Sequence, residues 1–255
     1  MDNKKELIID RVPEERTYTD RNIYRKYISV REKFCYRLKY RYTDLLVTSD
    51  KEIGNEIKQP LVSFYNDIEK VIASDEDFSK SLGPVKPLHS YPPVIKEMCR
   101  AAGVFGVGPM AAVAGAVCDS IAESVSRICD FLMIENGGDV YIKSSHPVSA
   151  GLFSSSRHFP QSLNITINPG HTPCGICSSS GVMGHSLSMG KSDLVTVMSH
   201  STAMADAAAT AIANSVTEKT DVDRALHYYK DNKYIKGLVI IKDDRLAVWG
   251  ALQLA

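Results

Sequence analysis

Hydrophobic and polar side chains alternate over residues 33–42, which predicts a half-buried β-strand with one basic face. A second strand is predicted for residues 43–49, where apolar side chains occupy the centre. We interpret the basic face, which includes Arg37 and Lys39, as a solvated sheet surface. Attraction of a phosphate-bearing ligand to this face is the alternative.

A helical period extends over residues 51–73, and Pro60 is expected to break or kink this helix near its middle. A Pro-rich linker follows between Pro84 and Pro93 and leads into a short helix that ends near Ala102. Ala-rich or amphipathic patterns predict three more helices, at residues 111–128, 202–216 and 222–229.

Short apolar runs predict the remaining strands, at residues 132–134, 150–154, 163–167 and 194–198. The C-terminal part predicts a hairpin of residues 237–241 and 246–251 that turns at Asp243 and Asp244. The stretch 169–191 is rich in Gly, Ser and Cys and is assigned no element. Because strands and helices mix irregularly, the pattern predicts an α+β fold. We expect an N-terminal arm over residues 1–27 and one domain over residues 28–255.

Composition narrows the function classes. The 255 residues are 44% hydrophobic and 24% charged, and 30 basic residues balance 30 acidic ones. This balance argues against a protein that coats nucleic acid or anionic membrane. There is no apolar run of the roughly 20 residues that a membrane helix needs, and the first residues lack the apolar core of a signal peptide, so we expect a cytoplasmic protein. Six cysteines are too few for a disulfide scaffold.

Two glycine motifs resemble nucleotide-binding loops. Gly184–Ser192 fails as a P-loop, because five residues separate its glycines and a strand follows. Gly106–Ala111 fits the loose GxGxxA pattern, but a helix precedes it where the dinucleotide-binding motif needs a strand. Even so, Gly108 followed by Pro109 suits the start of a helix, which attracts phosphate or carboxylate. The alternative is a tight turn that lets helices pack closely.

Two further polar groups are candidates for ligand binding. Asn136-Gly137-Gly138-Asp139 closes a buried strand, where polar groups often meet a ligand, although the same residues also suit a hairpin turn. Asp206 and Thr210 are four residues apart on an Ala-rich helix and therefore share one face. Their oxygens suit Mg²⁺ shared with a phosphate. The alternative is an exposed Asp and a Thr bonded to its own helix.

Cys174 and Cys177 form the most distinctive cysteine arrangement. A C-x-x-C pair is typical of a redox dithiol, a sulfur carrier or half of a metal site. Together with His171 and His185 it offers four zinc ligands, although the spacing matches no standard zinc finger. The alternative is that both cysteines are small buried hydrophobic residues.

In this order, the motifs resemble the ApbE superfamily, whose best-known members are Mg²⁺-dependent FAD:protein FMN transferases. The matching segments are Gly108–Asp119, Glu135–Asp139, Ser180–Gly181 and Ala205–Thr210. The resemblance implies a single ApbE-like domain with a mixed sheet and packed Ala-rich helices. It also implies Mg²⁺ held by Asp206 and Thr210, and FAD or another phosphorylated ligand. The cofactor-binding residues that it implies are Gly108, Asn136, Gly137, Gly138, Asp139, Ser180 and Gly181.

Two features of the flavin transferases have no counterpart here. Those enzymes carry a lysine in the helix-opening segment, whereas residues 110–119 contain none. They also carry an H-x-x-D-P-x-T-G loop after the S-G turn, where this chain has only Gly184-His185-Ser186. Both departures count against flavin-transferase activity of the usual kind, although the metal pair is retained.

From about residue 30 onward the chain more closely resembles an ApbE-like branch of anaerobic prokaryotes that has been linked to sulfide assimilation into homocysteine. The matching segments are Thr43–Leu45, Val107–Gly115, Glu135–Asp139, Cys177–Gly181 and Gly184–Ser186.

This resemblance implies sulfur transfer through a loop cysteine. Cys177, alone or with Cys174, would carry sulfur from a small-molecule or protein-bound donor, and partner proteins would take part in the transfer. His185 would generate the thiolate. The alternatives are a Mg²⁺-dependent FAD:protein FMN transferase, a flavin-binding protein and a non-catalytic ligand-binding scaffold.

Overall fold

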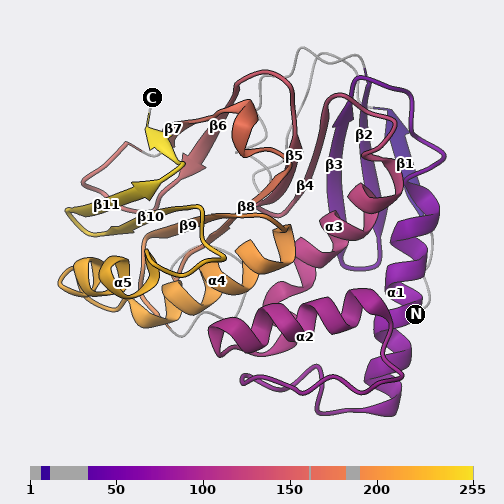
Figure 1. Ribbon diagram of the computed structural model, residues 1–255, viewed down its shortest axis with the longest axis horizontal. Coiled ribbons are helices and arrows are strands. Elements are labelled where there is room, and N and C mark those ends of the chain that lie inside the picture. Colours follow the sequence, from indigo (N-terminus) through magenta and orange to yellow (C-terminus); the bar gives the residue numbers. More distant parts are fainter. Residues whose placement is uncertain (1–6, 12–33, 161, 182–189, 255) are drawn as a thin grey trace.

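The computed structural model describes residues 7–11, 34–160, 162–181 and 190–254. In these residues a large antiparallel sheet carries helices on one face and a three-stranded sheet on the other (Figure 1). The strands are β1 (Ile8–Arg11), β2 (Phe34–Tyr40), β3 (Thr43–Ser49), β4 (Leu132–Asn136), β5 (Asp139–Lys143), β6 (Val148–Phe153), β7 (Ser162–Ile167), β8 (Cys174–Ser179), β9 (Leu194–Ser199), β10 (Gly237–Lys242), β11 (Arg245–Gly250) and β12 (Gln253–Leu254). The helices are α1 (Lys58–Ser74), α2 (Pro93–Phe105), α3 (Val113–Val125), α4 (Thr202–Ser215) and α5 (Asp221–Tyr229), with 3₁₀ turns η2 (Pro109–Ala112) and η3 (Pro169–His171).

The large sheet has the order β1-β2-β3-β4-β5-β8-β9-β10-β11, and the small sheet has the order β12-β7-β6. All neighbouring strands in the described residues are antiparallel. The predicted α+β class and single ApbE-like domain are confirmed. The expected mixed sheet is wrong, because each described strand runs opposite to its neighbours.

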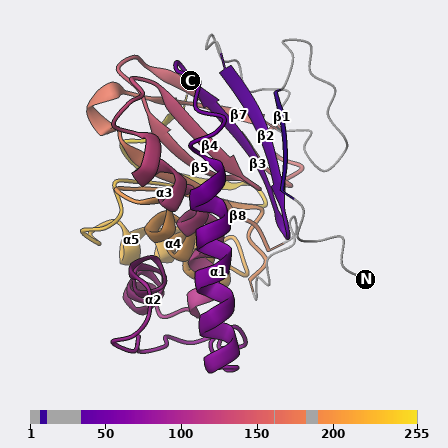
Figure 2. The same cartoon turned by 90° about the vertical axis from the view of Figure 1, so that its right-hand side faces the viewer.

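Two hydrophobic cores lie on the two faces of the large sheet. The first fills the space between the sheet and α1 to α4, and Figure 2 shows these helices gathered on one side of the strands. The second lies between the sheet and β6, β7 and the residues before β12. The Ala-rich sequence of α4 allows it to pack closely against β8, β9 and α3 at once.

Several predicted boundaries differ from the structure. The first long helix, α1, begins at Lys58, so Pro60 lies in its first turn and does not kink the middle. Strand β8 lies in the Gly, Ser and Cys-rich stretch 169–191, where the sequence pattern predicts no element. Strand β1 lies within the predicted N-terminal arm and pairs with β2.

No single helix in the described part of the chain is long and apolar enough to cross a membrane. Helix α2 and the segment Pro109–Val125 reach the required length and hydropathy only as a pair, and that pair is bent by 105°.

Candidate functional site

The segment Asn136–Asp139 is a two-residue hairpin turn between β4 and β5. Gly137 and Gly138 have φ angles of 66° and 110°, which glycine adopts without strain. A Cβ atom at either glycine would have no neighbouring atom within 4 Å, so the backbone of the turn is open on that side. The hairpin interpretation is therefore confirmed, and the turn is accessible to a ligand.

This turn lies against the first turn of α3. The side-chain amide of Asn136 donates to the carbonyl of Ala114 at 3.1 Å. The carboxylate of Asp206, from α4, accepts a hydrogen bond from the N–H of Gly115 at 3.0 Å. The structure thus brings together three segments that are distant in the sequence: the β4–β5 turn, the start of α3 and the second turn of α4. We call this place the α3–α4 junction.

Asp119, which the sequence analysis did not identify as a site residue, makes the reciprocal contact. Its two carboxylate oxygens accept hydrogen bonds from the N–H groups of Thr202 and Ala203, both at 2.9 Å. Asp119 on α3 therefore caps the start of α4, while Asp206 on α4 caps the start of α3. An acidic residue in a helix of mostly small and apolar side chains was the available signal, but its partner Thr202 lies 83 residues away.

Two glycines allow this close arrangement. A Cβ on Gly115 would lie 2.3 Å from the carbonyl oxygen of Thr202, and a Cβ on Gly175 would lie 2.3 Å from the Cα of Thr202. The start of α4 is therefore packed between the backbones of α3 and β8. No larger side chain fits at either glycine without moving α4.

The junction contains two interacting carboxyl groups. Burial, together with the charge of Glu135, raises the pKa of Asp139 to about 7, although hydrogen bonds with Cys177 and Ser178 oppose the shift. Burial also raises the pKa of Asp206 well above its ordinary value, and the charge of Asp139 adds to the shift. Because the negative charges of Asp139 and Asp206 repel each other where they are buried, a cation bound beside them would be stabilised.

The donor set fits Mg²⁺ completed by phosphate oxygens. Asp206 and Thr210 lie one turn apart on the partly buried face of α4, as predicted. No group of three or more His, Cys, Asp or Glu side chains in the described residues has a metal-binding arrangement. Mg²⁺ usually uses one or two protein carboxylates and takes its other ligands from water and phosphate, which two carboxylates and a hydroxyl satisfy.

Cys174 and Cys177 do not form a pair. Both lie on β8, where side chains three positions apart point to opposite faces of the sheet. Cys174 belongs to the core beneath the small sheet, and Cys177 belongs to the core beneath the helices. A redox dithiol or a zinc site that uses both sulfurs is therefore wrong for this fold.

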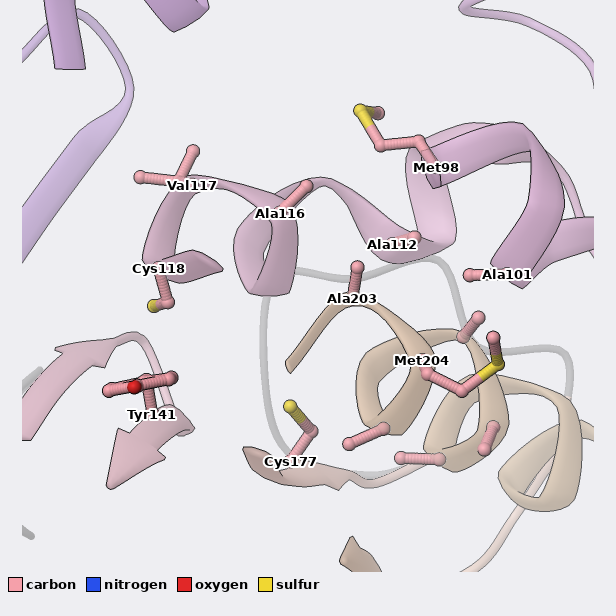
Figure 3. Close-up of a cluster of buried hydrophobic side chains, with 14 of the residues drawn as sticks. Met98, Ala101, Ala112, Ala116, Val117, Cys118, Tyr141, Cys177, Ala203 and Met204 are labelled. Carbon is pink, nitrogen blue, oxygen red and sulfur yellow. The ribbon is translucent and has the colours of Figure 1, made fainter. Parts of the chain in front are cut away.

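Cys177 itself is completely buried. Figure 3 shows it on β8 within the buried cluster that also contains Cys118 of α3 and Ala203 of α4. Its thiol lies 3.3 Å from the carbonyl of Thr202, to which it donates. Burial raises the pKa of the thiol well above its ordinary value, and the carboxyl group of Asp139 raises it further. Both effects disfavour the thiolate that a sulfur carrier needs.

The other predicted residues have different surroundings. A Cβ on Gly108 would lie 1.8 Å from the carbonyl oxygen of Ser81, so the backbone of the segment between α1 and α2 packs directly against this glycine. Ser180 and Gly181 follow β8, and both donate to the carbonyl of Ser192. His185, the predicted base, lies outside the described residues.

The fold is that of an ApbE-like protein. The structure of flavin transferase ApbE from Vibrio cholerae is similar with a TM-score of 0.54 and 14% identity, and the match covers 82% of this chain and 94% of that chain. The ApbE protein from Thermotoga maritima is similar with a TM-score of 0.50 and 11% identity, over 82% and 94% of the two chains. At these identities the likeness shows a shared fold.

The chain belongs to the family whose model is described as AbpE bacteria, which matches residues 25–242. A UPF0280 protein of Methanothrix thermoacetophila is 37% identical over 224 residues, which cover 87% of this chain and 92% of the relative. A UPF0280 protein of Methanopyrus kandleri is also 37% identical over 224 residues, covering 85% and 90%. The resemblance stated from the motifs is therefore confirmed.

Proposed function

We propose that this chain binds a flavin nucleotide together with Mg²⁺ at the α3–α4 junction. The observation that carries the proposal is the pair of buried, mutually repelling carboxyl groups, Asp139 and Asp206, beside an open glycine turn. The fold shared with flavin transferase ApbE supports the choice of a flavin nucleotide.

Each part of the junction has a role in this proposal. Asp206, Thr210 and Asp139 would hold the metal, which would neutralise the charge of the ligand phosphates. Asn136 fixes the turn against α3 through its bond to Ala114. The open backbone of Gly137 lets a ligand approach without meeting a side chain.

The proposal concerns binding and not covalent transfer of FMN. This chain lacks the lysine that the transferases carry in the segment matching residues 110–119. It also lacks their loop after the S-G turn. Flavin binding is also better supported than sulfide assimilation, because the thiol of Cys177 is buried and its pKa is raised.

The test is a titration of the purified full-length chain with FAD, followed by flavin fluorescence, with Mg²⁺ and again with EDTA. We expect saturable binding that requires Mg²⁺ and weakens by roughly tenfold or more in Asp206→Asn and in Asp139→Asn, since each variant removes one charged ligand of the metal. Asp223→Asn is the matched control, because Asp223 pairs with Arg245 on the exposed side of α5.

Failure to bind FAD up to about 1 mM, where binding is worth only about 4 kcal/mol, would overturn the proposal. Equal binding with Mg²⁺ and with EDTA would overturn the assignment of the carboxylates to a metal. Circular dichroism of each variant separates loss of binding from loss of the fold.

A further inference from the structure

The two edges of the large sheet differ in their sequences. Strand β1, at one edge, is Ile8–Arg11, and two of its four residues are charged. Strand β11, at the other edge, is Arg245–Gly250, and after Arg245 it contains only Leu, Ala, Val, Trp and Gly. Edge strands that must stay unpaired usually carry charges, proline or a bulge. Beyond its first residue, β11 has none of these protections.

The outer side of β11 is open for strand pairing. On its inner side β11 pairs with β10 in continuous register from Arg245 to Gly250, without a bulge. On its outer side the described residues provide no strand and no backbone hydrogen bond. The side chain of Val248, in the middle of the strand, is 36% exposed. An antiparallel strand placed here would satisfy the free N–H and C=O groups.

The surroundings of β11 also allow another strand to approach this edge closely. Helix α5 packs beneath β10 and β11, and Arg245 is neutralised by Asp223 of α5 at 2.7 Å. Tyr228, on the same helix, is 77% exposed. The end of the sheet therefore offers an apolar strand and an exposed aromatic ring, and the one cation of β11, Arg245, is already paired.

We propose that a second copy of this chain pairs with β11 in antiparallel fashion, about a two-fold axis at Val248. This register places Val248 opposite its own equivalent and Arg245 opposite Ala251. Like charges therefore do not meet, which makes the strand complementary to itself. A two-fold pairing also closes the assembly at two copies, and both sheets become one continuous sheet.

Sedimentation velocity on the full chain tests the pairing. We expect the mass to rise from 28.1 kDa toward twice that value between about 1 and about 100 µM, the affinity range of small interfaces. Val248→Lys and Val248→Glu should each weaken the dimer by roughly tenfold, because like charges would lie directly opposite each other. An equimolar mixture of the two variants should restore the dimer. Tyr42→Lys is the control, since Tyr42 is 82% exposed on the turn after β2.

A wild-type chain that stays monomeric over this range would overturn the proposal. A dimer that both charged variants leave unchanged would show that another surface forms it, which also overturns the proposal. If the mixture behaves like each variant alone, the register about Val248 is wrong. Thermal melts followed by circular dichroism establish that Val248→Lys and Val248→Glu are folded before their masses are compared.

Discussion

The substitution Gly175→Ala tests the packing of α4 on β8. The added Cβ would lie 2.3 Å from the Cα of Thr202 and 2.6 Å from its backbone nitrogen. Carbon atoms in contact are roughly 3.5–4.0 Å apart, so α4 must move away from β8 by more than about 1 Å. The colliding atoms belong to the backbone, and no rotation of a side chain can relieve the contact.

The loss of stability in Gly175→Ala can be estimated from this geometry. Overpacking a well-packed core usually costs about 1–3 kcal/mol, and a collision of two backbones belongs at the upper end of that range. The shift would also lengthen the bonds from Thr202 and Ala203 to Asp119, which are now 2.9 Å. We therefore expect the free energy of unfolding to fall by about 3 kcal/mol.

Equilibrium urea denaturation, followed by far-UV circular dichroism, measures this change. With a slope of about 2 kcal/mol per molar urea, the midpoint should fall by about 1.5 M. Gly103→Ala is the matched control, because Gly103 lies in α2 and a Cβ there would meet no atom within 4 Å. The control should raise stability by about 0.5–1 kcal/mol. A loss below about 0.5 kcal/mol in Gly175→Ala, within the range of ordinary surface changes, would refute the reasoning.

Three further predictions concern Asp139, Asp119 and the buried cysteines. Because burial holds the pKa of Asp139 at about 7, the native state binds more protons than the unfolded chain between about pH 4 and pH 7. The free energy of unfolding should therefore fall as pH rises through this window, and Asp139→Asn should reduce this pH dependence. If urea melts give wild type and Asp139→Asn the same pH dependence, the raised pKa of Asp139 is contradicted. Asp119→Ala removes two of the hydrogen bonds that cap α4, those from the N–H groups of Thr202 and Ala203, and should cost about 2–3 kcal/mol, more than Asp119→Asn. Equal urea midpoints for wild type and Asp119→Ala would contradict this capping role. All six cysteines are buried, so a thiol-specific disulfide reagent should modify fewer than one thiol quickly in the native protein; a rapid reaction mapped to Cys177 would instead favour a sulfur carrier.

The parts of the fold that follow from local periodicity could be predicted from the sequence. Burial on one face or on all sides leaves a pattern within a single segment of the sequence. Examples are the alternation in β2, the apolar run of β9 and the Ala-rich pattern of α4. The turn at Gly137 and Gly138 was also predictable, because only a few residue types adopt positive φ.

Strand β8 could not be predicted in this way. It is buried on both faces and contains Gly175, so it shows no alternation and has a composition typical of a loop. Missing this strand made Cys174 and Cys177 look like neighbours, whereas the strand geometry separates them. The role of Asp119 was hidden for another reason, since its contacts join residues more than 80 positions apart.

The reciprocal caps also bear on how the chain acquires its structure during synthesis. The start of α3 is capped by a residue that lies 91 positions later than Gly115. While the chain is being made from its N-terminus, α3 therefore lacks this cap until Asp206 has left the ribosome. The two helices must complete each other in one late step, so a ribosome pause before α4 would leave a nascent chain whose central helix is still unfinished.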